Sequence, residues 1–229
     1  LYDGGLVTGG TVKGALDDVA ALDAPAWRAM RWLEFSQRSS DVLRSVLDNP
    51  LLERLEGVVG AVDPSVIDLL QAGPIRHWNT LELRWLRAGD VARLAAVAHK
   101  LPRVTRLILH TDLVTPVLDA FPSLETLALH SYSDFARLVA AARQRGRLKR
   151  LVFEAGQNAF AAAMDLTSGA LTLWASWPVP RFECPPGVSS VQVVGPLDDT
   201  AALVEALEQT VPVAASRGRR PPLHEMLEA

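Results

Sequence analysis

The chain has 229 residues, of which 49% are hydrophobic and 21% charged, and its formal net charge is −3. This balance predicts a folded protein and excludes a largely disordered chain, which would need lower hydrophobicity and a higher net charge. The single cysteine excludes an internal disulfide framework and a multi-cysteine zinc site. The longest uncharged stretch, residues 166–180, is too short to span a bilayer.

Helix signals alternate with short apolar segments along the chain. Near the start, glycines surround Leu6-Val7, for which we predict the strand of a partial first repeat. Capping residues, prolines and apolar periodicity then indicate a series of helices. In chain order these are residues 10–22, 40–48, a helix beginning at Asp63-Pro64, 90–100, 115–121, 134–145 with Gly146 as its C-terminal cap, and 198–209. The proline-rich segment 174–187 cannot be a helix, and we expect it to cross the helix side as extended chain.

Between the helix signals, the pattern L-x-x-L-x-L recurs. Four clear copies occupy residues 78–83, 104–109, 124–129 and 148–153, and weaker copies occupy 30–35, 52–57, 168–173 and 188–193. The middle anchors of the eight copies are 20 to 26 residues apart. Each copy predicts a short strand whose anchors point into the core, and a strand–helix alternation at this period requires parallel strands with right-handed crossovers.

These copies resemble the leucine-rich repeat family, of a bacterial type with irregular repeats, over residues 26–196. The resemblance implies an α/β solenoid with a parallel sheet on its concave face and helices and extended segments on its convex face. One departure is that the family's Asn or Cys after each strand is replaced here. The residues at those positions are Leu86, Asp112, Tyr132 and Gly156.

We predict a single solenoid domain over residues 1–229, with a C-terminal capping helix within 197–215 and a flexible tail over 216–229. The chain starts without Met, and we expect it to be a fragment of a longer protein. Arginine outnumbers lysine 20 to 3, which is typical of a GC-rich bacterial genome, and we expect a cytoplasmic location.

The predicted register places two columns of side chains on the concave face. The residue between the last two anchors gives a column with an apolar centre at Ile108, Ala128 and Val152, and the residue after the last anchor gives a polar column. We therefore predict a non-enzymatic interaction module that binds a protein or peptide there; the alternative is a spacer segment of a larger protein. The predicted binding residues are Glu82, Arg84, Ile108, His110, Ala128, His130, Val152, Glu154 and Trp174.

A third hypothesis, ranked last, is a metal-dependent enzyme. His110, His130 and Glu154 would stand on adjacent strands about 4.8 Å apart, as three ligands of a divalent ion with an open position. The ligands come from three separate repeats, so we predict no metal and no cofactor.

Other chemistry finds little support. Cys184 has no histidine near it in the sequence, and no nucleophile or phosphate-binding motif is present. The basic residues between 143 and 150 lack interleaved aromatics, which argues against nucleic acid. Among the tryptophans, Trp85, Trp174 and Trp177 are expected to be exposed. The partner's identity, the oligomeric state and the role of Cys184 stay open.

Overall fold

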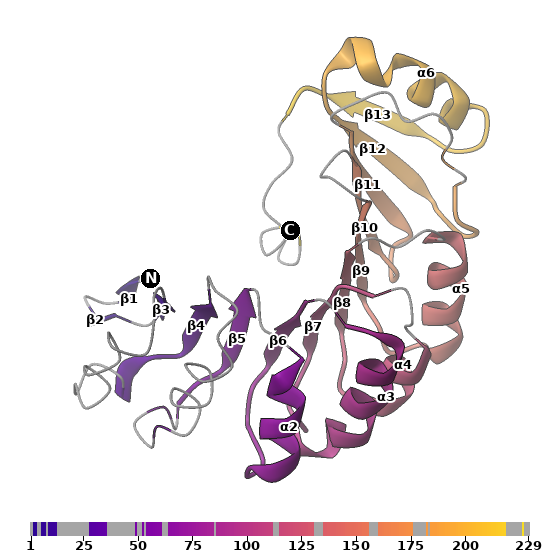
Figure 1. Ribbon diagram of the computed structural model, residues 1–229. Helices are drawn as coiled ribbons and strands as arrows, with labels where there is room; N and C mark the ends of the chain where they lie inside the picture. Colours follow the sequence, from indigo (N-terminus) through magenta and orange to yellow (C-terminus); the bar gives the residue numbers. More distant parts are fainter. Residues whose placement is uncertain are drawn as a thin grey trace. The chain divides into compact units, whose positions relative to one another are not determined.

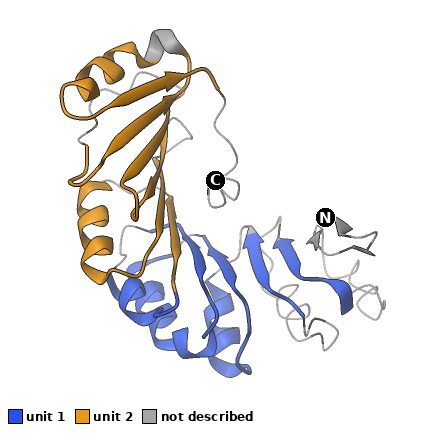
Figure 2. Ribbon diagram, turned by 180° about the vertical axis from the view of Figure 1, so that it is seen from behind, with its two compact units in different colours: residues 1–123 blue, residues 124–229 orange. Residues whose placement is uncertain are grey.

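The computed structural model describes residues 2–3, 6–7, 9–12, 28–35, 49, 52, 54–60, 64–84, 86–111, 115–130, 135–155, 160–175, 182, 184–218 and 226. The chain forms two compact units, Leu1–Ser123 and Leu124–Ala229, called unit 1 and unit 2 below (Figure 2). Both are mixed α/β structures in which the strands form an open sheet (Figure 1).

Unit 1 consists of parallel strands connected by helices. Its strands follow one another in the sheet in chain order: β3 (Gly9–Val12), β4 (Trp32–Phe35), β5 (Gly57–Gly60), β6 (Thr80–Leu83) and β7 (Arg106–Leu109). Its helices are α2 (Ser65–Ala72), α3 (Ala88–Val97), the 3₁₀ turn η4 (Ala98–Lys100) and α4 (Thr115–Ala120).

The predicted helices after residue 63 are present in unit 1, with one shifted start. The α3 helix begins at Ala88 rather than Asp90, because the Asp90 carboxylate accepts a hydrogen bond from the backbone N–H of Arg87 at 3.0 Å. Asp90 therefore caps from inside the first turn and not from in front of it. The inner face of α3 buries Val91, Leu94 and Val97. The predicted helix at 40–48 lies outside the described residues, as do residues 13–22 of the helix predicted at 10–22. The start of that helix is wrong, because residues 10–12 belong to strand β3, which pairs with β4.

Two predictions near the N-terminus are wrong. Leu6-Val7 forms β2, which pairs antiparallel with β1 (Tyr2–Asp3) in a separate two-stranded sheet and not as a repeat strand. The copy at 52–57 is also misplaced, because β5 begins at Gly57 and Val58 pairs with Leu81. Gly57 lies in register with Trp32, whose indole occupies the space that a side chain at 57 would need. The strand β5 therefore begins at the glycine that leaves room for this indole, and not at the preceding leucines.

The described part of unit 2 contains six strands. These are β8 (Thr126–His130), β9 (Arg150–Ala155), β10 (Phe160–Asp165), β11 (Ala170–Ala175), β12 (Ser190–Val194) and β13 (Val213–Ser216), adjacent in that order. Two helices connect parallel pairs: α5 (Phe135–Arg145) joins β8 to β9, and α6 (Leu197–Glu208) joins β12 to β13. Gly146 has a φ of 62°, as expected of a helix C-terminal cap.

The expectation of parallel strands throughout fails at β10, which pairs antiparallel with both β9 and β11. This strand was not predicted, because residues 160–165 lack the repeat's leucine spacing. The strand β13 was also missed, since its residues were assigned to the capping segment and the tail. The 20-residue step between the copies at 151 and 171 is thus spanned by a strand and not by a helix.

An aromatic cluster defines the helix side of the unit 2 sheet. Phe135 of α5 stacks on Phe153 of β9 with ring centroids 5.6 Å apart, and Phe153 meets Phe160 of β10 at 6.2 Å. Phe182, from the proline-rich segment, lies 5.5 Å from Phe160 and 6.4 Å from Phe135. This contact places Phe182 on the helix side, as predicted for that segment.

Candidate functional site

Successive side chains of a strand point to alternate faces of the sheet, so each unit has a face opposite its helices. In both units this opposite face carries the residues predicted to bind a partner. In unit 1 they are Glu82 and Arg84 at β6, and Ile108 and His110 at β7. The predicted register is correct here, since Leu81 pairs with Leu107 and Glu82 with Ile108.

A short ion pair orients the carboxylate in unit 1. The Arg84 Nε donates to Glu82 Oε1 at 2.6 Å, and the side chains of Arg84 and Glu82 are 36% and 9% exposed. A carboxylate this buried needs a charged or hydrogen-bonding partner, and Arg84 supplies one within the same strand end.

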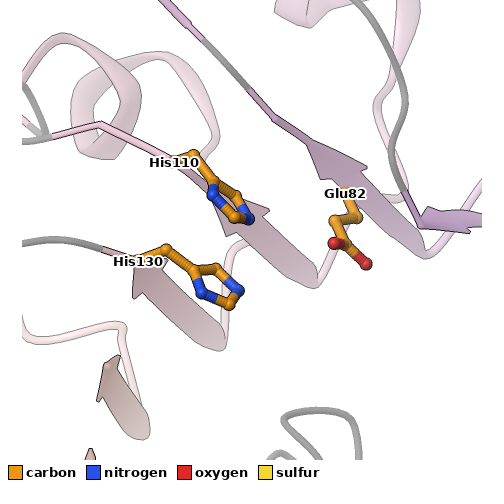
Figure 3. Close-up of side chains that lie close together, drawn as sticks. All are labelled: Glu82, His110 and His130. Carbon is orange, nitrogen blue, oxygen red and sulfur yellow. The ribbon is translucent and has the colours of Figure 1, made fainter. Parts of the chain in front are cut away.

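His110 lies near the same carboxylate. A ring nitrogen of His110 and a carboxylate oxygen of Glu82 are within 4.8 Å of each other, and Figure 3 shows the two side chains at the ends of β6 and β7. Glu82 and His110 were predicted in different columns, so the short distance between their side chains was not predicted. The available signal was their equal parity, because residues 82, 108 and 110 all face the same side in the register.

Unit 2 has a buried ion pair at the matching position. His130, also labelled in Figure 3, ends β8 and lies in register with Glu154 of β9. Its Nδ1 pairs with Glu154 Oε2, and the two side chains are only 16% and 5% exposed. The structure therefore brings together two of the three residues of the metal hypothesis; the third, His110, belongs to unit 1. Metal binding at this triad stays the hypothesis ranked last, and the prediction stays that no metal binds.

The apolar centre of the predicted surface is not exposed. Ile108 is 1% exposed, and Ala128 and Val152 are fully buried. The expectation that these residues face solvent is therefore wrong. Trp174 was also expected to be exposed, yet it is only 7% exposed and lies in register with Ala161 and Val194. Trp85 and Trp177 lie outside the described residues.

One residue of the predicted flexible tail is fixed against unit 2. Met226 is fully buried, and its backbone carbonyl accepts a hydrogen bond from Arg150 Nε at 2.9 Å. Burial lowers the pKa of Arg150, and the charge of Asp165 opposes this effect. A flexible tail was predicted over residues 216–229. Because Met226 is buried and bonded to Arg150, that prediction is wrong at this residue.

The basic residues between 143 and 150 are engaged within unit 2. Arg143 donates to the carbonyls of Pro186 and Gly187, both at 2.7 Å, and Lys149 Nζ contacts Glu125 at 2.8 Å. These contacts give the cluster a structural role. Burial raises the pKa of Cys184, which keeps its thiol protonated at neutral pH and therefore poorly nucleophilic.

Comparison with known proteins identifies no family. No family model and no curated protein matches the chain. A structure from Bacteroides fragilis, solved by the Northeast Structural Genomics Consortium, is similar with a TM-score of 0.47 and 11% sequence identity, covering 95% of this chain and 77% of that one. Among the described residues, no helix is long and apolar enough to cross a membrane.

Proposed function

We propose that the chain is a leucine-rich-repeat-like module that binds a protein or peptide through the opposite faces of its sheets. The in-register pairing of repeat anchors supports the likeness. Leu81 pairs with Leu107 in unit 1, and Leu127 with Leu151 in unit 2, with helices between the parallel strands. Stacked strand–helix units of this kind commonly expose a long sheet face for partners.

The observation that carries the proposal is a polar pair held in place on each of these faces. The Glu82–Arg84 pair adjoins Ile108, and the His130–Glu154 pair adjoins Val152. Side chains already held by partners lose little conformational entropy on binding, which favours recognition of a peptide's polar groups.

Binding rather than catalysis fits the groups available. The thiol of Cys184 is protonated at neutral pH, and its surroundings on the helix side lie away from the ion pairs. The residues on the opposite faces are engaged with one another, which suits recognition more than proton transfer. We therefore propose a non-enzymatic role.

A displayed peptide library panned against the full chain tests the proposal. Peptides that bind should lose about tenfold in affinity when Arg84 is replaced by alanine, which corresponds to about 1.4 kcal/mol. The matched control is Arg103→Ala, which removes an exposed arginine from the loop before β7 in the same unit. Its affinity should stay within about twofold of wild type.

Two outcomes would overturn the site. One is unchanged affinity in Arg84→Ala and His110→Ala for every selected peptide. The other is an equal or larger loss in Arg103→Ala, which would place the contact on the loop side. Far-UV circular dichroism of each variant shows whether a loss of binding follows from unfolding.

A further inference from the structure

Met226 lies on the opposite face of unit 2. Along β9, Leu151 and Phe153 point to the helix side, where Phe153 stacks on α5. Arg150 has the other parity, so its side chain leaves the sheet on the opposite face together with those of Val152 and Glu154. Because the Arg150 guanidinium donates to the Met226 carbonyl at 2.9 Å, Met226 must be on that face too.

A second, independent contact places the preceding chain on the same face. Val191 and Val193 of β12 are buried, whereas Gln192 between them is exposed, so Val194 shares the opposite face with Gln192. A Cβ at Gly218 would come within 2.6 Å of the Val194 Cγ1, closer than real atoms approach. The chain therefore runs tightly against this face just after β13, and glycine is the residue that fits there.

The surface near Arg150 is suited to one inserted apolar side chain. Val152 of β9 pairs in register with Ala163 of β10, and Glu154 pairs with Ala161. Two alanines beside a valine leave room above the sheet, yet Val152 and Ala161 are 0% exposed and Ala163 is 3% exposed. On β12 of the same face, Gln192 is exposed. The buried part of this face thus includes the β9–β10 region, and the fully buried Met226 is held beside it.

We propose that Met226 is a releasable internal occupant of the binding surface of unit 2, and that a partner peptide binds there by displacing it. The use of this surface by a partner rests on the function proposed above. The partner segment would present an unbranched apolar side chain, such as methionine, to the alanine-lined region. A backbone carbonyl next to that side chain would accept the hydrogen bond from Arg150, since guanidinium is a donor only.

The proposal predicts competition between the chain's own segment and the same segment added from outside. A fluorescent peptide of residues 217–229 should bind full-length Met226→Asp about tenfold more tightly than wild type, because the covalently attached segment no longer competes for the site. Adding Arg150→Met to that variant should weaken peptide binding about tenfold, because a methionine side chain has no hydrogen-bond donor. A control peptide with aspartate in place of Met226 should not bind either protein.

Equal peptide affinity in wild type and Met226→Asp would overturn the proposal, as would no binding to the folded variant. Methionine oxidation of the wild-type chain provides a test that needs no substitution. With peroxide, Met226 should oxidise faster than Met164, which is fully buried in β10 and reacts only when the sheet opens. Equal rates would show that Met226 is a permanent part of the core. None of these outcomes would change the binding of library peptides in the Arg84 experiment, so failure of this proposal is distinguishable from failure of the proposed function.

Discussion

Unit 1 and unit 2 connect neighbouring strands in different ways. In unit 1, α2 and α3 lie between parallel strands. In unit 2, the step from β9 to β11 contains β10, which runs back through the sheet antiparallel to both. The copies at 151 and 171 keep their direction but are no longer neighbours. The residues between two repeat strands can therefore form either a helix beside the sheet or a strand within it.

The largest expected effect is the loss of stability when a buried side chain is removed. It compares β10 with the repeat strand β7. Leu107→Ala in β7 and Met164→Ala in β10 each remove a side chain that is 0% exposed, so each should cost about 2–5 kcal/mol. Denaturant unfolding followed by tryptophan fluorescence measures the free energies. A cost below about 1 kcal/mol for Met164→Ala alone would remove β10 from the core.

Glycine-to-alanine substitutions should have opposite signs in the two units. Gly187 has a φ of 78° and contacts the Arg143 guanidinium where a Cβ would be, so Gly187→Ala should destabilise unit 2 by about 1–3 kcal/mol. Gly89 lies in α3 with open space at its Cβ position, so Gly89→Ala should stabilise unit 1 by about 0.5–1 kcal/mol. Thermal unfolding of the two variants checks both signs, and a stabilised Gly187→Ala would contradict the contact with Arg143.

The two ion pairs should differ in strength. The Glu154 side chain is 5% exposed, so His130→Ala leaves a poorly solvated carboxylate and should cost about 1–3 kcal/mol. Arg84 is 36% exposed, so its removal lets water reach the Glu82 carboxylate, and Arg84→Ala should cost less, at most about 1 kcal/mol. Replacing the carboxylates as well, in double-mutant cycles, isolates each pair's coupling. A larger coupling for Glu82–Arg84 would show that burial does not set their order.

The smallest effect concerns acid sensitivity of the β10–β11 turn in unit 2. Hydrogen bonds from the Thr167 hydroxyl and the Ser168 and Thr167 amides lower the pKa of Asp165 to about 2. Its contribution is present above the unfolded-state pKa of about 3.9 and is lost as the pH falls towards 2. Asp165→Ala should therefore be less stable than wild type at pH 6, with the difference shrinking between pH 4 and pH 2. A constant difference would assign the loss to packing.

Sequence patterns were sufficient where contacts are local. The helices α3, α4, α5 and α6 follow from caps and apolar spacing, and the register of β6 with β7 follows from the leucine anchors. They were insufficient where a distant residue decides the outcome. Gly57, where β5 begins, packs against the Trp32 indole of the neighbouring strand. The strand β10 enters the sheet by pairing with β9 and β11.

The candidate site shows the same division. The sequence by itself determined that Glu82, Arg84, His130 and Glu154 share faces opposite the helices, because alternation along a strand is a property of the backbone. Only the tertiary structure decided that Ile108 and Val152 are buried, and that Arg150 holds Met226. Exposure depends on what the rest of the chain lays over a residue, and Arg150 and Met226 are 76 positions apart in the sequence.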